Sequence, residues 1–100
     1  MRGMDAKARR ALRTIRGCVR SERYIVLPHF TQQMDRRGLF WPDVLAVLDD
    51  PAEVKAQGFD RFSRRKWILT GTAADGLGVE IVCVLDVDER GEVTVFITIY

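Results

Sequence analysis

The side chains of this sequence that could do chemistry are cations and groups that carry protons. They are His29, Arg36, Arg37, Arg64, Arg65, Lys66, Glu80 and Tyr100. His29 is the only histidine, and imidazole is the side chain that titrates closest to neutral pH. A proton carrier and several cations can break a phosphodiester without a metal ion, because the cations stabilise charge that develops on the phosphate. We therefore interpret His29, Arg37, Lys66 and Tyr100 as candidate catalytic residues, and Arg65, Arg64, Arg36 and Glu80 as candidate substrate-binding residues.

Each of these candidates also has a purely structural interpretation. His29 lies in the first turn of a predicted helix, where its ring could bond to the backbone, and Arg37 could satisfy carbonyls at the other end of that helix. The basic run 64–66 could be the charged start of a strand that resists aggregation. Tyr100 could simply pack, whereas Glu80 could be a general base on an open sheet face. The sequence leaves these alternatives open.

Several classes of site are not expected. The sequence has no metal-binding motif, no glycine-rich nucleotide loop and no Ser-His-Asp order, so we expect no metal ion and no cofactor. Cys18 and Cys83 have no CxxC partner, which indicates reduced core thiols in a cytoplasmic protein. No apolar run reaches the length of about 18 residues that a membrane-spanning helix needs. We therefore expect no membrane association.

The elements that must position the candidates follow from periodicity and turn residues. Helices are predicted over 4–19, 29–37 and 43–49, and strands over 24–27, 65–72, 79–87 and 93–99. Residues 57–63 are predicted to be a turn region. The short loops after residue 72 favour an antiparallel meander, and the length of the chain favours one domain over 1–100. The last two strands are apolar on both faces, so one face can take the helices and the other would be partly covered or bind a partner.

Positive charge is concentrated at the N-terminus. Residues 1–23 carry eight Lys/Arg and two acidic residues, whereas residues 24–100 carry eight basic and twelve acidic residues. The first predicted helix and the residue after it carry five arginines with no acid between them, Arg9, Arg10, Arg13, Arg16 and Arg20. We expect Arg9, Arg13, Arg16 and Arg20 to be exposed. Contact with phosphate is a further expectation, because guanidinium binds phosphate bidentately. DNA binding through this helix is a further alternative, although no helix-turn-helix pattern is evident.

A longer pattern, H-x-x-x-x-M-x-x-R-G, runs from His29 to Gly38. It resembles the pattern of small bacterial domains of unknown function that are grouped with the RelE- and MqsR-type ribonuclease toxins. The basic-aromatic start at 65–67 and the final T-x-Y are similar too, and the resemblance covers roughly residues 6–100. It implies a RelE-like α+β fold, in which N-terminal helices pack on a curved antiparallel β-sheet.

The same resemblance implies a function. Related toxins cut mRNA and are blocked by a cognate antitoxin, so the expected function is that of a toxin–antitoxin toxin, a metal-independent endoribonuclease. On this model His29 and Arg37 are motif residues, and Arg65, Lys66 and Tyr100 are further candidates. The expected partners are a cognate antitoxin protein, RNA or the ribosome, and a second copy of the chain. The alternative is a non-catalytic protein-interaction module of the same fold that binds through its apolar sheet face.

Overall fold

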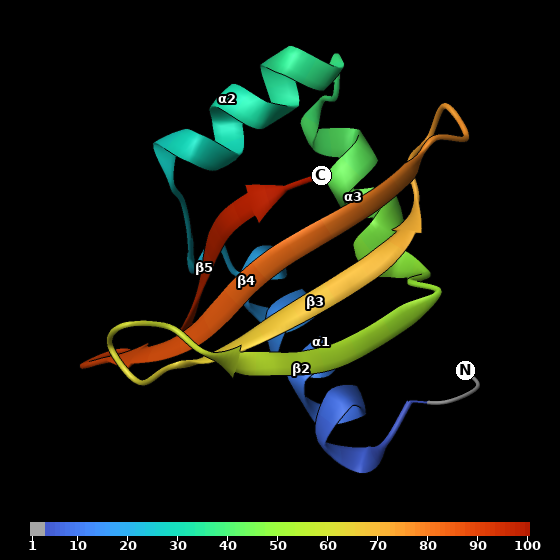
Figure 1. Cartoon of the computed structure of the whole chain (residues 1–100). Coiled ribbons are helices and arrows are strands. Elements are labelled where there is room, and N and C mark those ends of the chain that lie inside the picture. Colours follow the sequence, from blue (N-terminus) through green and yellow to red (C-terminus); the bar gives the residue numbers. More distant parts are fainter. Residues whose placement is uncertain (1–3) are drawn as a thin grey trace.

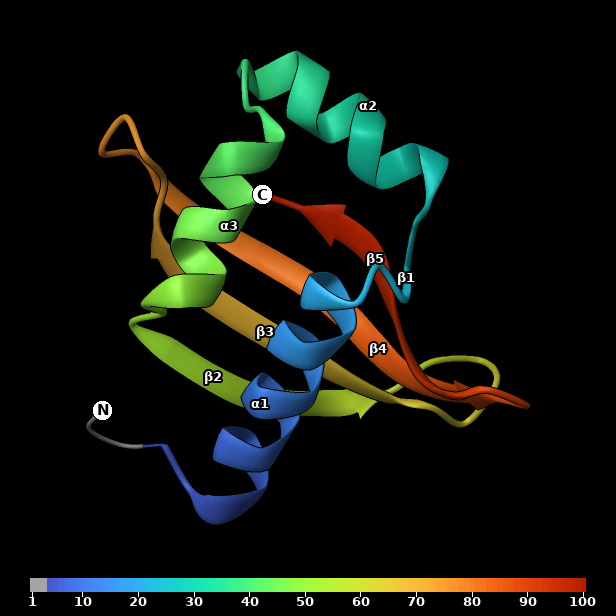
Figure 2. The ribbon, with the colours of Figure 1, turned by 180° about the vertical axis from the view of Figure 1, so that it is seen from behind.

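Three helices and a five-stranded sheet form the described part of the chain, residues 4–100, in this computed structural model. Their order is α1 (Ala6–Arg20), β1 (Tyr24–Val26), α2 (Pro28–Arg37), α3 (Trp41–Asp49), β2 (Glu53–Phe59), β3 (Arg65–Thr72), β4 (Gly78–Asp88) and β5 (Gly91–Ile99). The helices α1 and α3 lie over one face of the sheet (Figure 2). The other face, turned toward the viewer in Figure 1 and called the helix-free face below, has no helix of residues 4–100 over it. The predicted α+β class is confirmed.

The sheet is mixed rather than wholly antiparallel. Its strand order is β1-β5-β4-β3-β2, and the pairs from β5 to β2 are antiparallel. The short strand β1 runs parallel to β5, with Ile25 opposite Val95. The expectation of an antiparallel sheet is therefore wrong at this edge. The two strands are far apart in the chain, so no connecting loop indicated their relative direction.

The strand β2 was not expected, and the predicted turn region began too early. Residues up to Phe59 continue the strand, and the chain reverses between Asp60 and Arg64. In β2 only Val54 is buried. An edge strand of this kind has no alternation of apolar and polar residues, so period-2 patterning could not reveal it.

The core lies between the sheet and the two helices on it. From α1 it takes Ala8, Ala11, Leu12, Ile15 and Cys18, all buried. The predicted face of α3 is confirmed, since Val44, Val47 and Leu48 are buried as well. A Cβ on Gly71 of β3 would lie 3.1 Å from Val47 Cγ1, so glycine there allows α3 to approach the sheet closely. Among the described residues, no helix is both long and apolar enough to cross a bilayer.

Arg16 joins the two helices that cover the sheet. Its Nε donates to the carbonyl oxygen of Leu48 at 2.7 Å, and its Nη2 to that of Asp49 at 2.6 Å. These are carbonyls at the C-terminus of α3, which carries a partial negative charge and favours a cation. The sequence predicted an exposed Arg16, but this contact leaves it half-buried.

Asp43 orders the other end of α3. Its Oδ2 accepts from the N–H of Phe40 at 2.8 Å, and its Oδ1 accepts from the N–H of Ala74 at 3.1 Å. A carboxylate in a first helical turn is favoured by the helix dipole. Because Ala74 lies in the β3–β4 turn, the same side chain fixes α3 against the sheet.

The docking of α1 can be tested with two substitutions in adjacent residues. Leu12 is 4% exposed, so Leu12→Ala should lower the free energy of unfolding by about 2–4 kcal/mol, as for other core leucines. Arg13→Ala is the matched control, because Arg13 is exposed and its loss should change stability by less than about 0.5 kcal/mol. Urea denaturation measures both. Equal stability of the Leu12 variant and the parent would show that α1 is not docked.

Candidate functional site

The helix α2 positions three of the predicted site residues. It ends at Gly38, whose φ of +66° lies in the left-handed region that glycine adopts freely. His29 is exposed in the first turn, and its ring makes no hydrogen bond to any residue in the range 4–100. Arg36 is exposed in the last turn. Beside it, Arg37 Nη2 donates to the carbonyl oxygen of Gly78 at 3.2 Å, so this arginine links α2 to the first residue of β4.

Glu80 and Tyr100 lie side by side at the same end of the sheet. Their backbones exchange two hydrogen bonds, of 3.0 and 2.8 Å, so the two residues are directly opposed and their side chains share a face. That face is the helix-free one, because the neighbouring Ile81 and Ile99 are fully buried in the core. Arg37 contacts β4 only two residues from Glu80. The structure therefore brings Glu80 and Tyr100 together, and Arg37 reaches the backbone of β4 at the same end of the sheet.

Arg65 and Lys66 point to opposite faces of the sheet. Arg65 lies two residues before Trp67 and so points to the same face, where Trp67 belongs to the core under α1. Lys66 points to the helix-free face, where it lies opposite Val84. Val84 is six residues along β4 from Gly78, so Lys66 is about 20 Å from the contact that Arg37 makes. The basic pair cannot hold one phosphate between them on either face.

His29 is remote from both members of that pair. It follows β1, which is separated from β3 by β5 and β4, and three strand spacings amount to about 14 Å. A metal-free ribonuclease site built from these candidates would need His29, Arg37, Arg65 and Lys66 to converge on one surface. The structure brings together neither the histidine and the basic pair nor the two members of the pair.

Arg64 is held by two carboxylates. It forms ion pairs with Asp60 and Asp86, each at 2.8 Å. Desolvation alone would raise the pKa of Asp60, but hydrogen bonds from Arg64 and from the N–H of Phe62 hold it below its ordinary 3.8. The pKa of Asp86 is lowered as well, first by the N–H of Val87 and then by Arg64. Arg64 therefore stabilises the β2–β3 loop through its two ion pairs and is not a free cation.

A pocket of about 420 Å³ lies between α1 and the sheet, and we call it the α1–β3 pocket. Its lining residues are Lys7, Arg10, Ala11, Thr14, Arg65, Trp67, Leu85 and Glu92. Lys7 and Arg10 come from one flank of α1, and Arg65 is the only predicted site residue among them. Within the part of the chain that the structure describes, none of these three cations has a carboxylate within 4 Å. Glu92 is the one acid in the lining.

Two exposed aromatic rings lie near this end of the sheet, and one of them contacts a residue that lines the pocket. Phe59 is 59% exposed and Phe62 is 64% exposed. The Arg65 guanidinium lies 5.0 Å from the centre of the Phe59 ring, and Arg61 lies 5.0 Å from that of Phe62. Phe59 is the last residue of β2, and Phe62 belongs to the β2–β3 loop, at the left of Figure 1. We missed these residues in the sequence, where phenylalanines interleaved with arginines over 59–65 were the available signal.

The cysteines and the acidic side chains offer no further centre. Burial raises the pKa of the Cys83 thiol to about 12, which leaves no thiolate for nucleophilic attack at neutral pH. Cys18 is buried and unpaired too. In the described residues, no three or more His, Cys, Asp or Glu side chains are grouped so as to hold a metal ion.

The Arg64 ion pairs predict a pH dependence of stability. Because Asp60 and Asp86 have lowered pKa values in the folded protein, their stabilisation is complete above the unfolded pKa and is lost as the pH falls below it. Arg64→Gln should therefore reduce the loss of stability between about pH 7 and about pH 3. Arg61→Gln, in the same loop, is the control and should leave that loss unchanged. The midpoints of urea denaturation at both pH values measure this loss. The same loss in the parent and in both variants would contradict the role of the Arg64 ion pairs.

The comparisons with known proteins add no relative to this geometry. No protein-family model, no curated protein and no solved structure matches the chain. The α1–β3 pocket with its neighbouring aromatic rings is therefore a candidate site on physical grounds alone.

Proposed function

We propose that this chain is a RelE-like, toxin-type domain that binds single-stranded RNA and cleaves it without a metal ion. The observation that carries the proposal is the α1–β3 pocket, where Lys7, Arg10 and Arg65 lie without carboxylate partners in the described chain. Unpaired cations around one pocket favour an anionic ligand, and most of the affinity of proteins for nucleic acid comes from phosphate contacts.

The exposed rings favour RNA over a simple anion. Single strands bind where a cationic groove follows the backbone and aromatic side chains stack on unpaired bases. Phe59 offers such a ring beside the pocket, under the Arg65 guanidinium, and Phe62 offers a second exposed ring in the β2–β3 loop, under Arg61. A phosphate ion or a small acid would leave these two rings without a role.

The cleavage step needs a proton acceptor near the bound phosphate, and Glu92 is the acid in this pocket. Its carboxylate would take the proton of the ribose 2′-hydroxyl, whose oxygen attacks the adjacent phosphorus. The bond from phosphorus to the 5′-oxygen breaks, the 5′-oxygen takes a proton from water, and a 2′,3′-cyclic phosphate remains. Arg10 and Arg65 would stabilise the charge that develops on the phosphate oxygens.

The toxin setting is part of the proposal. Helices that cover one sheet face and leave the other open support the resemblance to RelE-type toxins. That resemblance implies a cognate antitoxin and RNA, on or off the ribosome, as partners. It also implies that the protein acts in the cytoplasm, with a second copy of the chain as a further partner.

A non-catalytic interaction module is the second candidate. It is favoured by the separation of His29 from the cations, since a protein that cleaves RNA through its only histidine would bring them together. Its expected contact surface, however, offers little apolar area. Ile68, Val82, Val84 and Val95 on the helix-free face are each at most 7% exposed.

RNA binding can be tested by removing cations from one flank of α1. With a fluorescent single-stranded RNA of about 15 nucleotides, Lys7→Gln with Arg10→Gln should weaken binding and lower the slope of log K against log salt by about 0.7 for each lost phosphate contact. Arg20→Gln, on the other flank, is the control and should change the slope little. Anisotropy titrations at several salt concentrations measure this. Equal slopes for all three proteins would remove the pocket from RNA binding.

Cleavage can be tested separately, in the presence of a chelator, with two variants. Glu92→Gln should lower the cleavage rate by about 10²–10⁴-fold, the usual effect of losing a general base. His29→Ala should cleave at the parent rate. A loss of cleavage in His29→Ala but not in Glu92→Gln would assign the catalytic role to His29. A folded parent protein that binds RNA but never cuts it would leave RNA binding as the function.

A further inference from the structure

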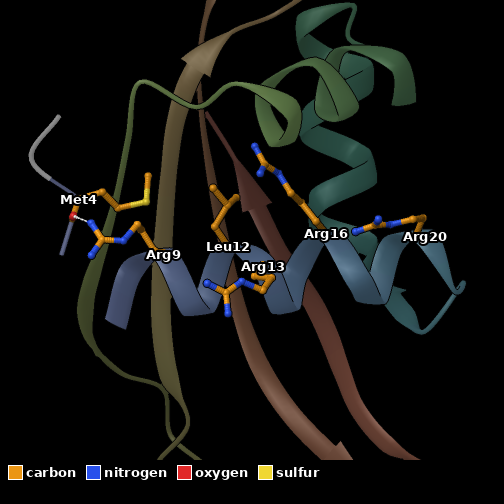
Figure 3. Close-up of a pocket in the computed structure, with 6 residues that line it drawn as sticks. All are labelled: Met4, Arg9, Leu12, Arg13, Arg16 and Arg20. Atoms are coloured by element: carbon orange, nitrogen blue, oxygen red, sulfur yellow. Dashed lines mark hydrogen bonds between the residues drawn. The ribbon is translucent and has the colours of Figure 1, made fainter. Parts of the chain in front are cut away.

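A line of four arginines runs along α1 beside the flank that carries Lys7 and Arg10. Arg9, Arg13, Arg16 and Arg20 are spaced i, i+4, i+7 and i+11, so they follow one side of the helix over about 16 Å. Together with Met4 and Leu12 they line a pocket of about 330 Å³ (Figure 3). Figure 3 shows Leu12 between the arginine side chains.

This hollow continues toward α3. A second pocket of about 460 Å³ is lined by Arg16, Val19, Arg20, Leu45, Leu48 and Asp49. Because the two pockets share Arg16 and Arg20, we treat them as one feature and call it the arginine groove. Its floor is apolar, with Leu12 and Leu48 deeply buried, whereas Val19 and Leu45 remain half-exposed.

The arginines of the groove are not equally free. Arg16 donates to two carbonyls of α3, and Arg9 donates to the carbonyl oxygen of Met4 at 2.7 Å. Arg13 and Arg20 make neither a hydrogen bond nor an ion pair through their guanidinium groups with any of residues 4–100. Asp49 is the one acid that lines the groove, so its net charge is strongly positive.

We propose that the arginine groove is a docking site for an acidic amphipathic helix of a partner protein. A helix with carboxylates spaced i, i+4, i+7 and i+11 would match the arginine line turn for turn, and its apolar side chains would cover Val19 and Leu45. RNA fits less well, because no aromatic ring lines either pocket in the described chain and a phosphate backbone has no apolar face for the floor. Arg16 and Arg20 lie on the α3 side of α1, away from the α1–β3 pocket, and docking of a helix there does not depend on RNA binding.

The experiment uses the full chain and a fluorescent synthetic peptide of about 18 residues, or five helical turns, with leucines on one face and glutamates on both flanks. A scrambled peptide of the same composition separates shape from charge, and single-stranded oligouridylate reports binding of nucleic acid. Arg13→Glu with Arg20→Glu changes the groove. Lys7→Glu with Arg10→Glu is the matched control, because it makes the same charge change on the other flank of the same helix.

The groove variant should bind the peptide at least about tenfold more weakly than the matched control does, since close charge pairs are lost only in the former. The parent should prefer the peptide over its scrambled form. If charge reversal unfolds the helix, as circular dichroism would show, Arg13→Gln with Arg20→Gln should give the same order with a smaller effect. Equal weakening by both double variants, equal binding of the scrambled peptide, or oligouridylate binding that depends on Arg13 and Arg20 would each overturn the proposal.

Discussion

The burial of one narrow stripe of α1 against the sheet determines where the positive charge of this protein lies. The stripe consists of Ala8, Ala11, Leu12, Ile15 and Cys18. All six cations of the helix must lie outside it, and the 3.6-residue period divides them between two flanks. Lys7 and Arg10 come to lie next to β3, whereas Arg16 and Arg20 come to lie next to α3. Arg9 and Arg13 extend the same line of arginines along α1. Neither candidate surface exists without this docking, because both have the helix as one wall and a neighbouring element as the other.

Whether a cation is available to a ligand depends on what else it contacts. Arg64 and Arg23 are paired with aspartates at the end of the sheet where the loops turn. Arg16 and Arg37 donate to backbone carbonyls of other elements. Lys7, Arg10, Arg13 and Arg20 of α1, by contrast, have no carboxylate within 4 Å in the described chain. The asymmetry of charge along the sequence thus becomes an asymmetry of charge in space.

The sequence predicted the elements whose signals are local, and it failed where distant parts of the chain decide. The strand 65–72 and the helix end at Gly38 depend on neighbouring residues, and both are confirmed. The parallel pairing of β1 and the edge strand β2 depend on partners far along the chain, and both were missed. The candidate site failed for a simpler reason. Residues adjacent in a strand point to opposite faces, so the predicted strand at Arg65 and Lys66 already places the two side chains on different faces.

The two proposed surfaces would influence each other through charge even without touching. A helix with its side chains is about 10–12 Å across, whereas the Debye length at physiological salt is about 8 Å. An acidic helix in the arginine groove would therefore lower, but not abolish, the positive potential that RNA meets on the far flank. Such coupling is reciprocal: bound RNA lowers the affinity for the partner by the same factor by which the bound partner lowers the affinity for RNA. An acidic partner could in this way oppose RNA binding from a site that RNA never occupies, and rising salt would weaken both ligands and the coupling between them.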